Sequence, residues 1–179
     1  MPTIITHAVA GASLAQALAP ASHRRAVALL AAVTAMLPDA DVAGFRLGIP
    51  YGDLLGHRGL THSLLFACVA SMAGILLFRT GQSAADKFRI MACIAVATAS
   101  HGILDAFTDG GLGVAFFAPF DATRYFFPVT PIRVSPLGIQ AIFSQRGVAV
   151  LASELEWVWA PALAIEAAAG IVRDKRGPR

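Results

Sequence analysis

Five histidine and aspartate residues stand out because each lies beside an apolar stretch and not among the polar segments of the chain. They are His7, Asp39, His62, His101 and Asp105. An aspartate at the centre of a membrane helix costs roughly 2.5–3.5 kcal/mol on insertion scales, so residues kept in such places generally have a function. Imidazole and carboxylate groups are common ligands of divalent ions. The residue types therefore indicate a metal.

His101 and Asp105 are four residues apart in an apolar stretch that we predict to be helical. Residues at this spacing lie on one helix face and can hold one ion from adjacent turns. Alone, such a pair is more often a simple polar contact on a helix surface. Joined by further ligands, with one position open for water, it would form a hydrolytic site.

A second polar cluster covers residues 37–41 and 56–63. Asp39 and Asp41 can supply one ligand and one acceptor that orients a coordinating histidine, although a solvated turn would also explain them. His62 is a better candidate ligand than His57, because free N–H groups at a helix start also attract an anionic substrate. Arg58 could pair with a phosphate or with either carboxylate.

The composition indicates a membrane environment for these residues. Of 179 residues, 56% are apolar and only 14% are charged, and the mean hydropathy is +0.66. The length suits one domain, residues 1–179. The net charge is +3, but the basic residues lie in short loops and the tail, so we expect no nucleic-acid partner. No basic residue precedes Arg24, so we expect the N-terminal segment to be retained and not cleaved as a signal peptide.

Apolar periodicity predicts five helices that must position the polar residues. We expect the second to stop at Pro38, the third to be capped by Thr61 and the fourth by Asp86. Residues 3–107 would carry the metal site, residues 108–147 would form a Gly/Pro-rich interfacial loop, and residues 148–172 a C-terminal membrane helix. The fold class is an all-α integral membrane bundle. The predicted helices cover residues 3–18, 25–37, 64–78, 90–107 and 148–172.

The basic residues predict the orientation of the bundle. Nine fall on one side of the membrane and five, spread over longer loops, on the other, and the positive-inside rule places the nine in the cytoplasm. All five metal-site candidates then lie at the opposite face, which is periplasmic in a bacterial inner membrane. The nine are Arg24, Arg25, Arg79, Lys87, Arg89, Arg173, Lys175, Arg176 and Arg179; the five are Arg46, Arg58, Arg124, Arg133 and Arg146.

The order and spacing of these motifs resemble the YdjM-like family of membrane-bound metal-dependent hydrolases, some members of which are described as LexA-regulated. That family is distantly similar to the zinc-dependent phospholipase C and single-strand nuclease superfamily. The resemblance covers residues 3 to about 138. It rests on Thr6-His7, Leu37-Pro38-Asp39-x-Asp41, His57-Arg58-Gly59-x-Thr61-His62-Ser63, His101-x-x-x-Asp105 and the loop from Pro119-Phe120 to Pro136.

The resemblance implies a ligand set and a cofactor. The implied ligands are His7, Asp39, His62, His101 and Asp105, with one or two zinc ions and with Asp105 bridging them where there are two. His57 is a further candidate in the outer shell of the site. The superfamily enzymes carry additional ligands after the His-x-x-x-Asp pair, whereas this chain has no histidine beyond His101, which argues against a third ion.

These residues predict a hydrolase in which metal-activated water attacks a phosphoester or related ester of a lipid-like substrate. Asp39 or Asp41 could be the general base. Arg124 and Arg133 could hold a phosphate while Phe126 and Phe127 rest among acyl chains, although these aromatics equally fit a simple interfacial anchor. The competing class is a non-catalytic membrane protein, either a metal-stabilised scaffold or a transporter. A transporter should carry polar residues through the middle of its spans, and here they gather at one edge.

Overall fold

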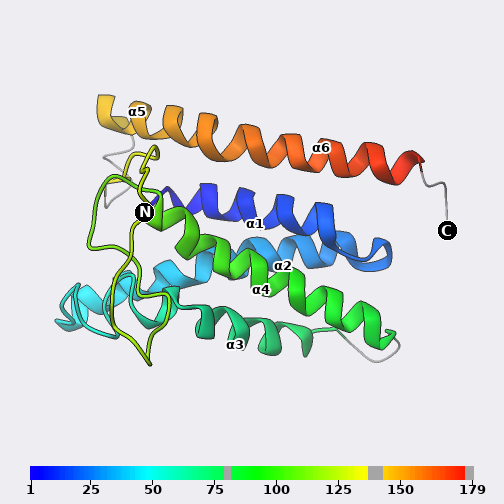
Figure 1. Cartoon of the computed structure of the whole chain (residues 1–179), viewed down its shortest axis with the longest axis horizontal. Coiled ribbons are helices and arrows are strands. Elements are labelled where there is room, and N and C mark those ends of the chain that lie inside the picture. The colour runs from blue at the N-terminus through cyan, green and yellow to red at the C-terminus, as the bar shows by residue number, and fades with distance from the viewer. Residues whose placement is uncertain (79–81, 137–142, 176–179) are drawn as a thin grey trace.

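The computed structural model describes residues 1–78, 82–136 and 143–175. Within these ranges the chain is helical, and its only β-type pairings are two isolated bridges, Thr108 with Ile132 and Val114 with Tyr125. The helices lie side by side along one axis (Figure 1). The predicted all-α bundle of about five helical rods is therefore confirmed. The basic residues Arg79, Arg176 and Arg179 lie outside the described residues.

The centre of the bundle is the hairpin of α1 (Ile4–Leu18) and α2 (Arg24–Met36), against which α4 (Ala84–Ala106) packs. The hairpin is close because α1 has a glycine at its crossing point. A Cβ on Gly11 would lie 2.6 Å from the Ala31 carbonyl oxygen and 2.7 Å from the Ala35 Cβ. Small residues allow helix backbones to approach in this way in membranes.

The second helix changes type at Pro38 and does not end there. The α-helical part stops at Met36, as predicted, but the chain continues directly as a 3₁₀-helix, Leu37–Leu47, up to Gly48. Proline lacks an N–H, so it cannot continue an α-helix, yet it is tolerated in the first turn of a new helix. This change of helix type carries Asp39 and Asp41 past the end of α2.

Two predicted caps are wrong. The third helix, α3 (Leu64–Ile75), begins at Ser63, whose hydroxyl accepts a hydrogen bond from the Phe66 N–H. The fourth, α4, begins at Ser83, which accepts from the N–H of Asp86. In both cases a serine with extended backbone stands at the position from which a side chain reaches the first free N–H groups. The third helix also ends earlier than the predicted residue 78, which leaves it 12 residues long.

The C-terminal rod is continuous but not uniform. It consists of α5 (Gln145–Glu154), a π-helical turn (Leu155–Trp159) and α6 (Ala160–Lys175). Pro161 lies two residues after the π-turn and cannot donate a backbone hydrogen bond, and a local change of helix type accommodates it. The predicted single helix over residues 148–172 is therefore two α-helices joined by a wider turn.

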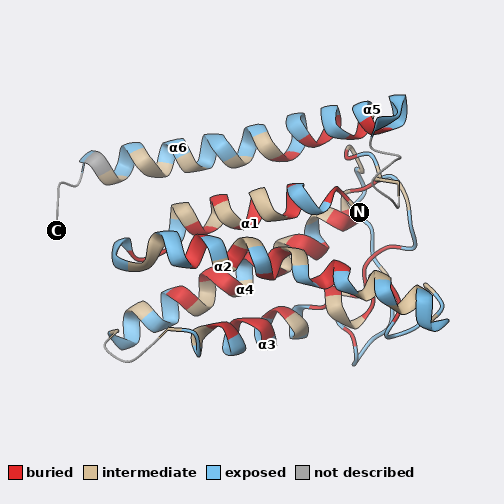
Figure 2. Cartoon of the chain, turned by 180° about the vertical axis from the view of Figure 1, so that it is seen from behind, coloured by how far each residue is buried: buried red, intermediate tan, exposed pale blue. Residues whose placement is uncertain are grey.

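Among the described residues, three rods are long and apolar enough to cross a membrane: Ala21–Leu47, Ala84–Ala106 and Gln145–Arg173. The outer faces of the rods carry exposed apolar side chains, such as Leu29 at 72% and Phe88 at 73% exposure. Figure 2 shows buried residues on the inner faces and exposed residues on the outer ones. Apolar surface of this extent suits lipid and not water. The shorter helices α1 and α3 pack alongside the rods.

Candidate metal centre

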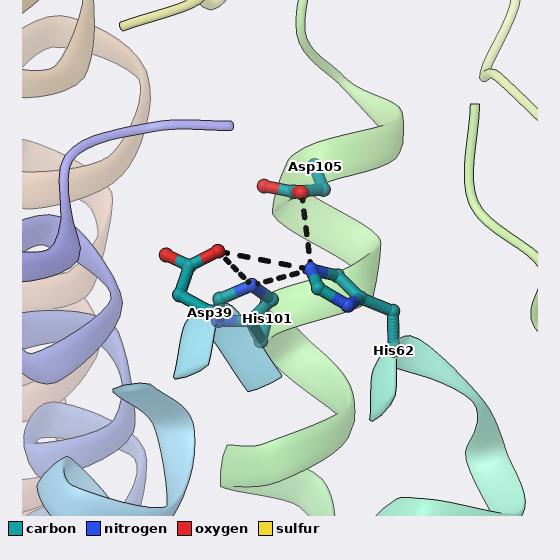
Figure 3. Close-up of side chains that lie close together, drawn as sticks. All are labelled: Asp39, His62, His101 and Asp105. Atoms are coloured by element: carbon teal, nitrogen blue, oxygen red, sulfur yellow. Dashed lines mark hydrogen bonds and ion pairs between the residues drawn. The ribbon is translucent and has the colours of Figure 1, made fainter. Parts of the chain in front are cut away.

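Four of the predicted ligands converge at one end of the bundle (Figure 3). Asp39 comes from the 3₁₀-helix after α2, His62 from a short 3₁₀-helix (Leu60–His62), and His101 and Asp105 from the last turns of α4. One ligand atom from each lies within 4.8 Å of all the others. All four residues are buried, the most exposed being Asp39 at 7%.

The separations between these ligand atoms suit a tetrahedral ion. The Nε2 atoms of His62 and His101 are 3.0 Å apart, and His101 Nε2 lies 3.3 Å from Asp39 Oδ1. His62 Nε2 lies 3.5 Å from Asp105 Oδ2 and 3.8 Å from Asp39 Oδ1. Ligands of a tetrahedral zinc ion are roughly 3.4 Å from one another. The described residues thus fit one such ion.

Hydrogen bonds orient both histidines toward the same point. Nδ1 of His101 donates to the carbonyl oxygen of Ala35 at 2.7 Å, and Nδ1 of His62 lies 3.2 Å from Asp41 Oδ2. A nitrogen that donates to an oxygen carries the proton, which leaves a lone pair on each Nε2. Two lone pairs facing each other at 3.0 Å repel, unless a proton or a metal ion lies between them.

In the protein without metal, a proton takes that position. Burial lowers the pKa of His62, but the close, negatively charged carboxylates of Asp105 and Asp41 outweigh burial and raise the pKa to about 9. His62 is therefore a cation at neutral pH when no other cation is bound. A metal ion has to replace this proton in order to bind.

Several buried polar atoms at the centre have no hydrogen-bond partner among the described residues. They include both carboxylate oxygens of Asp39 and Asp105 and both ring nitrogens of His7. Buried polar atoms are otherwise nearly always paired, so this group fits a bound cation. The ionised carboxylates of Asp39, Asp41 and Asp105, set against the buried guanidinium of Arg58, leave two negative charges, which is the charge that one divalent ion balances.

His7, the fifth predicted ligand, lies beside the four without being one of them. Its ring stacks on that of His101 with the centroids 3.6 Å apart, and its Nε2 lies 3.5 Å from Asp105 Oδ1. His7 therefore faces Oδ1 of Asp105, whereas His62 faces Oδ2. His7 thus belongs to the surroundings of the four-residue group, next to Asp105 and His101.

Asp41 and His57 lie behind His62. Asp41 Oδ1 accepts a hydrogen bond from His57 Nδ1 at 2.7 Å, and Oδ2 accepts one from the Thr61 hydroxyl at 2.6 Å. Asp41, His57 and His62 form a second group with ligand-like spacing, but these hydrogen bonds already occupy the Asp41 carboxylate. Thr61, expected to be a helix cap, instead holds Asp41. Its position one residue before His62 was the only sequence signal for this contact.

Arg58 pairs with Asp105, and not with Asp39 or Asp41 as the sequence suggested. Its Nε lies 2.9 Å from Asp105 Oδ2, without the alignment of a hydrogen bond, while Nη1 donates to the Gly110 carbonyl and Nη2 to the Thr108 hydroxyl. The side chain is fully buried, and the residue has a positive φ of 62°. This backbone conformation is unfavourable for arginine by roughly 1–2 kcal/mol.

The two arginines predicted to hold substrate phosphate lie differently. Arg124 donates hydrogen bonds to the carbonyl oxygens of His57, Tyr51 and Asp53, so it braces the loop against the preceding segment. Arg133 is exposed, and its side chain makes no hydrogen bond or ion pair within the described residues. The structure therefore does not bring either guanidinium into contact with the four converging residues.

Comparison with known proteins agrees with a membrane location. A profile of the family described as YdjM inner membrane protein matches residues 1–176. The inner membrane protein YbcI of Escherichia coli (strain K12) is 37% identical over 163 residues, 91% of this chain and 94% of that protein. The uncharacterized protein YvsG of Bacillus subtilis (strain 168) is 35% identical over 92 residues, 48% of this chain and 53% of that protein. No solved structure matches the chain. The chain therefore belongs to the YdjM family of inner membrane proteins.

Proposed function

We propose that this protein is a membrane-bound metal-dependent hydrolase that holds a divalent ion, most simply zinc, through Asp39, His62, His101 and Asp105. The observation that carries the proposal is the pair of Nε2 atoms 3.0 Å apart. Each histidine is oriented through its other nitrogen by an oxygen acceptor, which is a common arrangement at zinc sites. An ion bound there would supply Lewis-acid activation of water or of an ester oxygen.

The chain's own groups fit distinct roles in this proposal. Asp39 is the better candidate for a general base, because both of its oxygens lack hydrogen-bond partners among the described residues. Asp41 is a positioning residue, since His57, Thr61 and His62 already surround its carboxylate. Arg58 fixes Asp105 through Oδ2, the carboxylate oxygen that also faces His62.

The proposed substrate is a lipid phosphoester or a related ester. Support comes from the loop that follows α4, which lies at the same end of the bundle as the four ligands (Figure 1). It exposes aromatic side chains, with Phe120 at 85%, Phe126 at 43% and Phe127 at 37% exposure. Exposed aromatics of this kind anchor segments at a membrane surface, where lipid headgroups are found. Of the two predicted phosphate-binding residues, Arg133 is the one whose guanidinium has no hydrogen-bond or ion-pair partner among the described residues.

A structural metal site is the second candidate function. Four buried protein ligands complete a tetrahedral zinc site without leaving a position for water, and all four residues here are buried. The number of ligands around the ion separates the two cases. A water ligand would favour the hydrolase, and four protein ligands alone would favour the scaffold.

The first experiment is elemental analysis of the purified protein. We expect about one divalent ion per chain, lost in His101→Ala and Asp105→Ala and kept in His23→Ala, a histidine at the opposite end of the bundle. Wild-type protein that stays metal-free after reconstitution with Zn²⁺ would exclude the metal site.

Hydrolysis of phosphatidylglycerol or phosphatidylcholine by the zinc-loaded protein, absent in His101→Ala, then tests the reaction. Zinc binding without turnover of any ester would reject the hydrolase and favour the structural metal site.

A further inference from the structure

A cavity of about 480 Å³ lies at the end of the bundle away from the metal centre. It is formed by the connection between α1 and α2 and by the C-terminal part of α6, both of which lie at that end in Figure 1. Its volume is in the roughly 300–1,000 Å³ range of small-molecule sites. The polar residues that line it are Gln16, Ser22, His23, Arg24, Arg25 and Arg173.

The lining of this cavity is basic. Arg24, Arg25 and Arg173 come from segments about 150 positions apart in the sequence, and the described lining residues include no acidic one. Within the part of the chain that the structure describes, none of the three forms an ion pair with a carboxylate. Nε of Arg24 is shielded from solvent and has no hydrogen-bond partner. Arg173 is held in place because its Nη1 donates to the Gln16 carbonyl at 2.9 Å.

Backbone groups add to this positive potential. The helical run begins at Ala21 as a short 3₁₀-helix (Ala21–His23) and continues as α2, and neither start has a side-chain cap. The first turn of α2 contains no acidic residue. The first N–H groups of a helix carry a partial positive charge and bind phosphate readily. Arginine side chains and a helix start thus face one hollow.

Exposed apolar side chains lie near the lining residues in the sequence. Leu18 comes just before the connection between α1 and α2 with 47% exposure, Leu29 is one turn beyond Arg25 with 72%, and Ile171 is two residues before Arg173 with 58%. A basic hollow on helices that also expose apolar side chains matches the boundary between acyl chains and headgroups. Basic pockets between membrane helices on the cytoplasmic side bind anionic lipid headgroups.

We propose that this cavity binds an anionic phosphate group. The group would be supplied either by a phospholipid headgroup or by free phosphate from the adjoining solution. This site is separate from the metal centre, because Gln16 is in the last turn of α1 whereas His7 is in its first turns. Its occupation does not depend on the proposed hydrolase activity.

The test is native mass spectrometry of the full-length protein titrated with phosphatidylglycerol. Replacing two phosphate-binding arginines in Arg24→Gln/Arg173→Gln should weaken binding by about tenfold or more. The matched control is Arg46→Gln/Arg146→Gln, which removes the same charge from exposed positions elsewhere and should bind as the wild type does. Equal binding by the wild type and Arg24→Gln/Arg173→Gln, or an equal loss in the control, would overturn the proposal.

Two additional measurements keep the result interpretable. Arg25→Gln changes only an exposed side chain, so it cannot disturb packing and should still weaken binding. The unfolding temperature of every variant in detergent should stay close to that of the wild type, which shows that the fold is intact. Competition by inorganic phosphate would identify the free anion as a ligand, and binding of phosphatidylglycerol without such competition would identify the lipid. Absence of binding by both probes would also reject the site.

Discussion

His62 is the residue at which a proton would compete with the proposed metal ion. Its pKa in the metal-free fold is about 9, compared with 6.5 for an unperturbed histidine. Because the folded pKa is the higher one, the bound proton stabilises the metal-free fold fully below pH 6.5. This contribution is lost as the pH rises through about 9.

We predict that the affinity for Zn²⁺ rises with pH over this interval. Binding has to release the His62 proton, so affinity should increase by roughly tenfold per pH unit and level off near pH 9. Competition with a chelator of known pH dependence measures this. The same titration by thermal unfolding should show that zinc stabilises the fold more at high pH. An affinity that does not change with pH would contradict the protonated state of His62.

At the scale of elements, a buried carboxylate joins α5 to α1 beside the metal centre. Glu154 is fully buried and accepts hydrogen bonds from the hydroxyls of Thr3 and Thr6 at 2.7 and 2.6 Å. Trp159, in the π-helical turn, donates from Nε1 to the Thr6 hydroxyl at 2.8 Å. Thr6 directly precedes His7, so this network holds the first turns of α1 next to the site.

Removal of this carboxylate should destabilise the protein. Glu154→Ala leaves the Thr3 N–H and the Thr6 hydroxyl buried without their acceptor, which costs about 1–3 kcal/mol for each unsatisfied group. Thermal unfolding in detergent measures the loss. Glu156→Ala, two residues away and exposed, is the control and should change the free energy of unfolding by less than about 0.5 kcal/mol. Equal effects of the two substitutions would argue against the network.

The close contact between α1 and α2 gives a second prediction at this scale. Gly11→Ala should destabilise the fold by about 1–3 kcal/mol, because the new methyl group would overlap the Ala31 carbonyl and the Ala35 side chain. Gly170→Ala is the control, since its Cβ would meet only the Arg173 Nη2, at 3.7 Å. There the better helix propensity of alanine should stabilise by up to about 1 kcal/mol. The two unfolding temperatures should therefore shift in opposite directions.

At the scale of the whole molecule, the two ends of the bundle differ in charge and in chemistry. The candidate metal centre lies where α1 begins and α4 ends, while the basic cavity lies where α1 ends and α6 approaches its C-terminus. The positive-inside rule assigns the basic end to the cytoplasm. The metal centre would then face the periplasm in a bacterial inner membrane.

Reporter fusions test this orientation. Alkaline phosphatase fused after Pro136 should be active, because that loop is expected on the periplasmic face. The same enzyme fused at the C-terminus should be inactive, while a fluorescent protein at the C-terminus should fluoresce. An active alkaline phosphatase at the C-terminus would reverse the assignment and place the metal centre in the cytoplasm.

The sequence by itself predicted the helical rods and the residue types at the site. Long apolar segments are enough to identify helices in a membrane protein, because every backbone group in lipid has to be satisfied within its own segment. Likewise, the four-residue spacing of His101 and Asp105 was enough to place both on one face of α4. The details at the helix ends were less predictable: Ser63 and Ser83 are the caps, and the chain continues past Pro38.

Only the tertiary structure decided which polar groups meet. Arg58 pairs with Asp105, Asp41 orients His62, and the four ligand atoms gather within 4.8 Å. These contacts join residues up to 66 positions apart, as between Asp39 and Asp105. They depend on how closely α1, α2 and α4 approach and on how the loops fold over their ends, which no local pattern specifies. Packing between helices is what turns scattered histidines and aspartates into a single candidate metal centre.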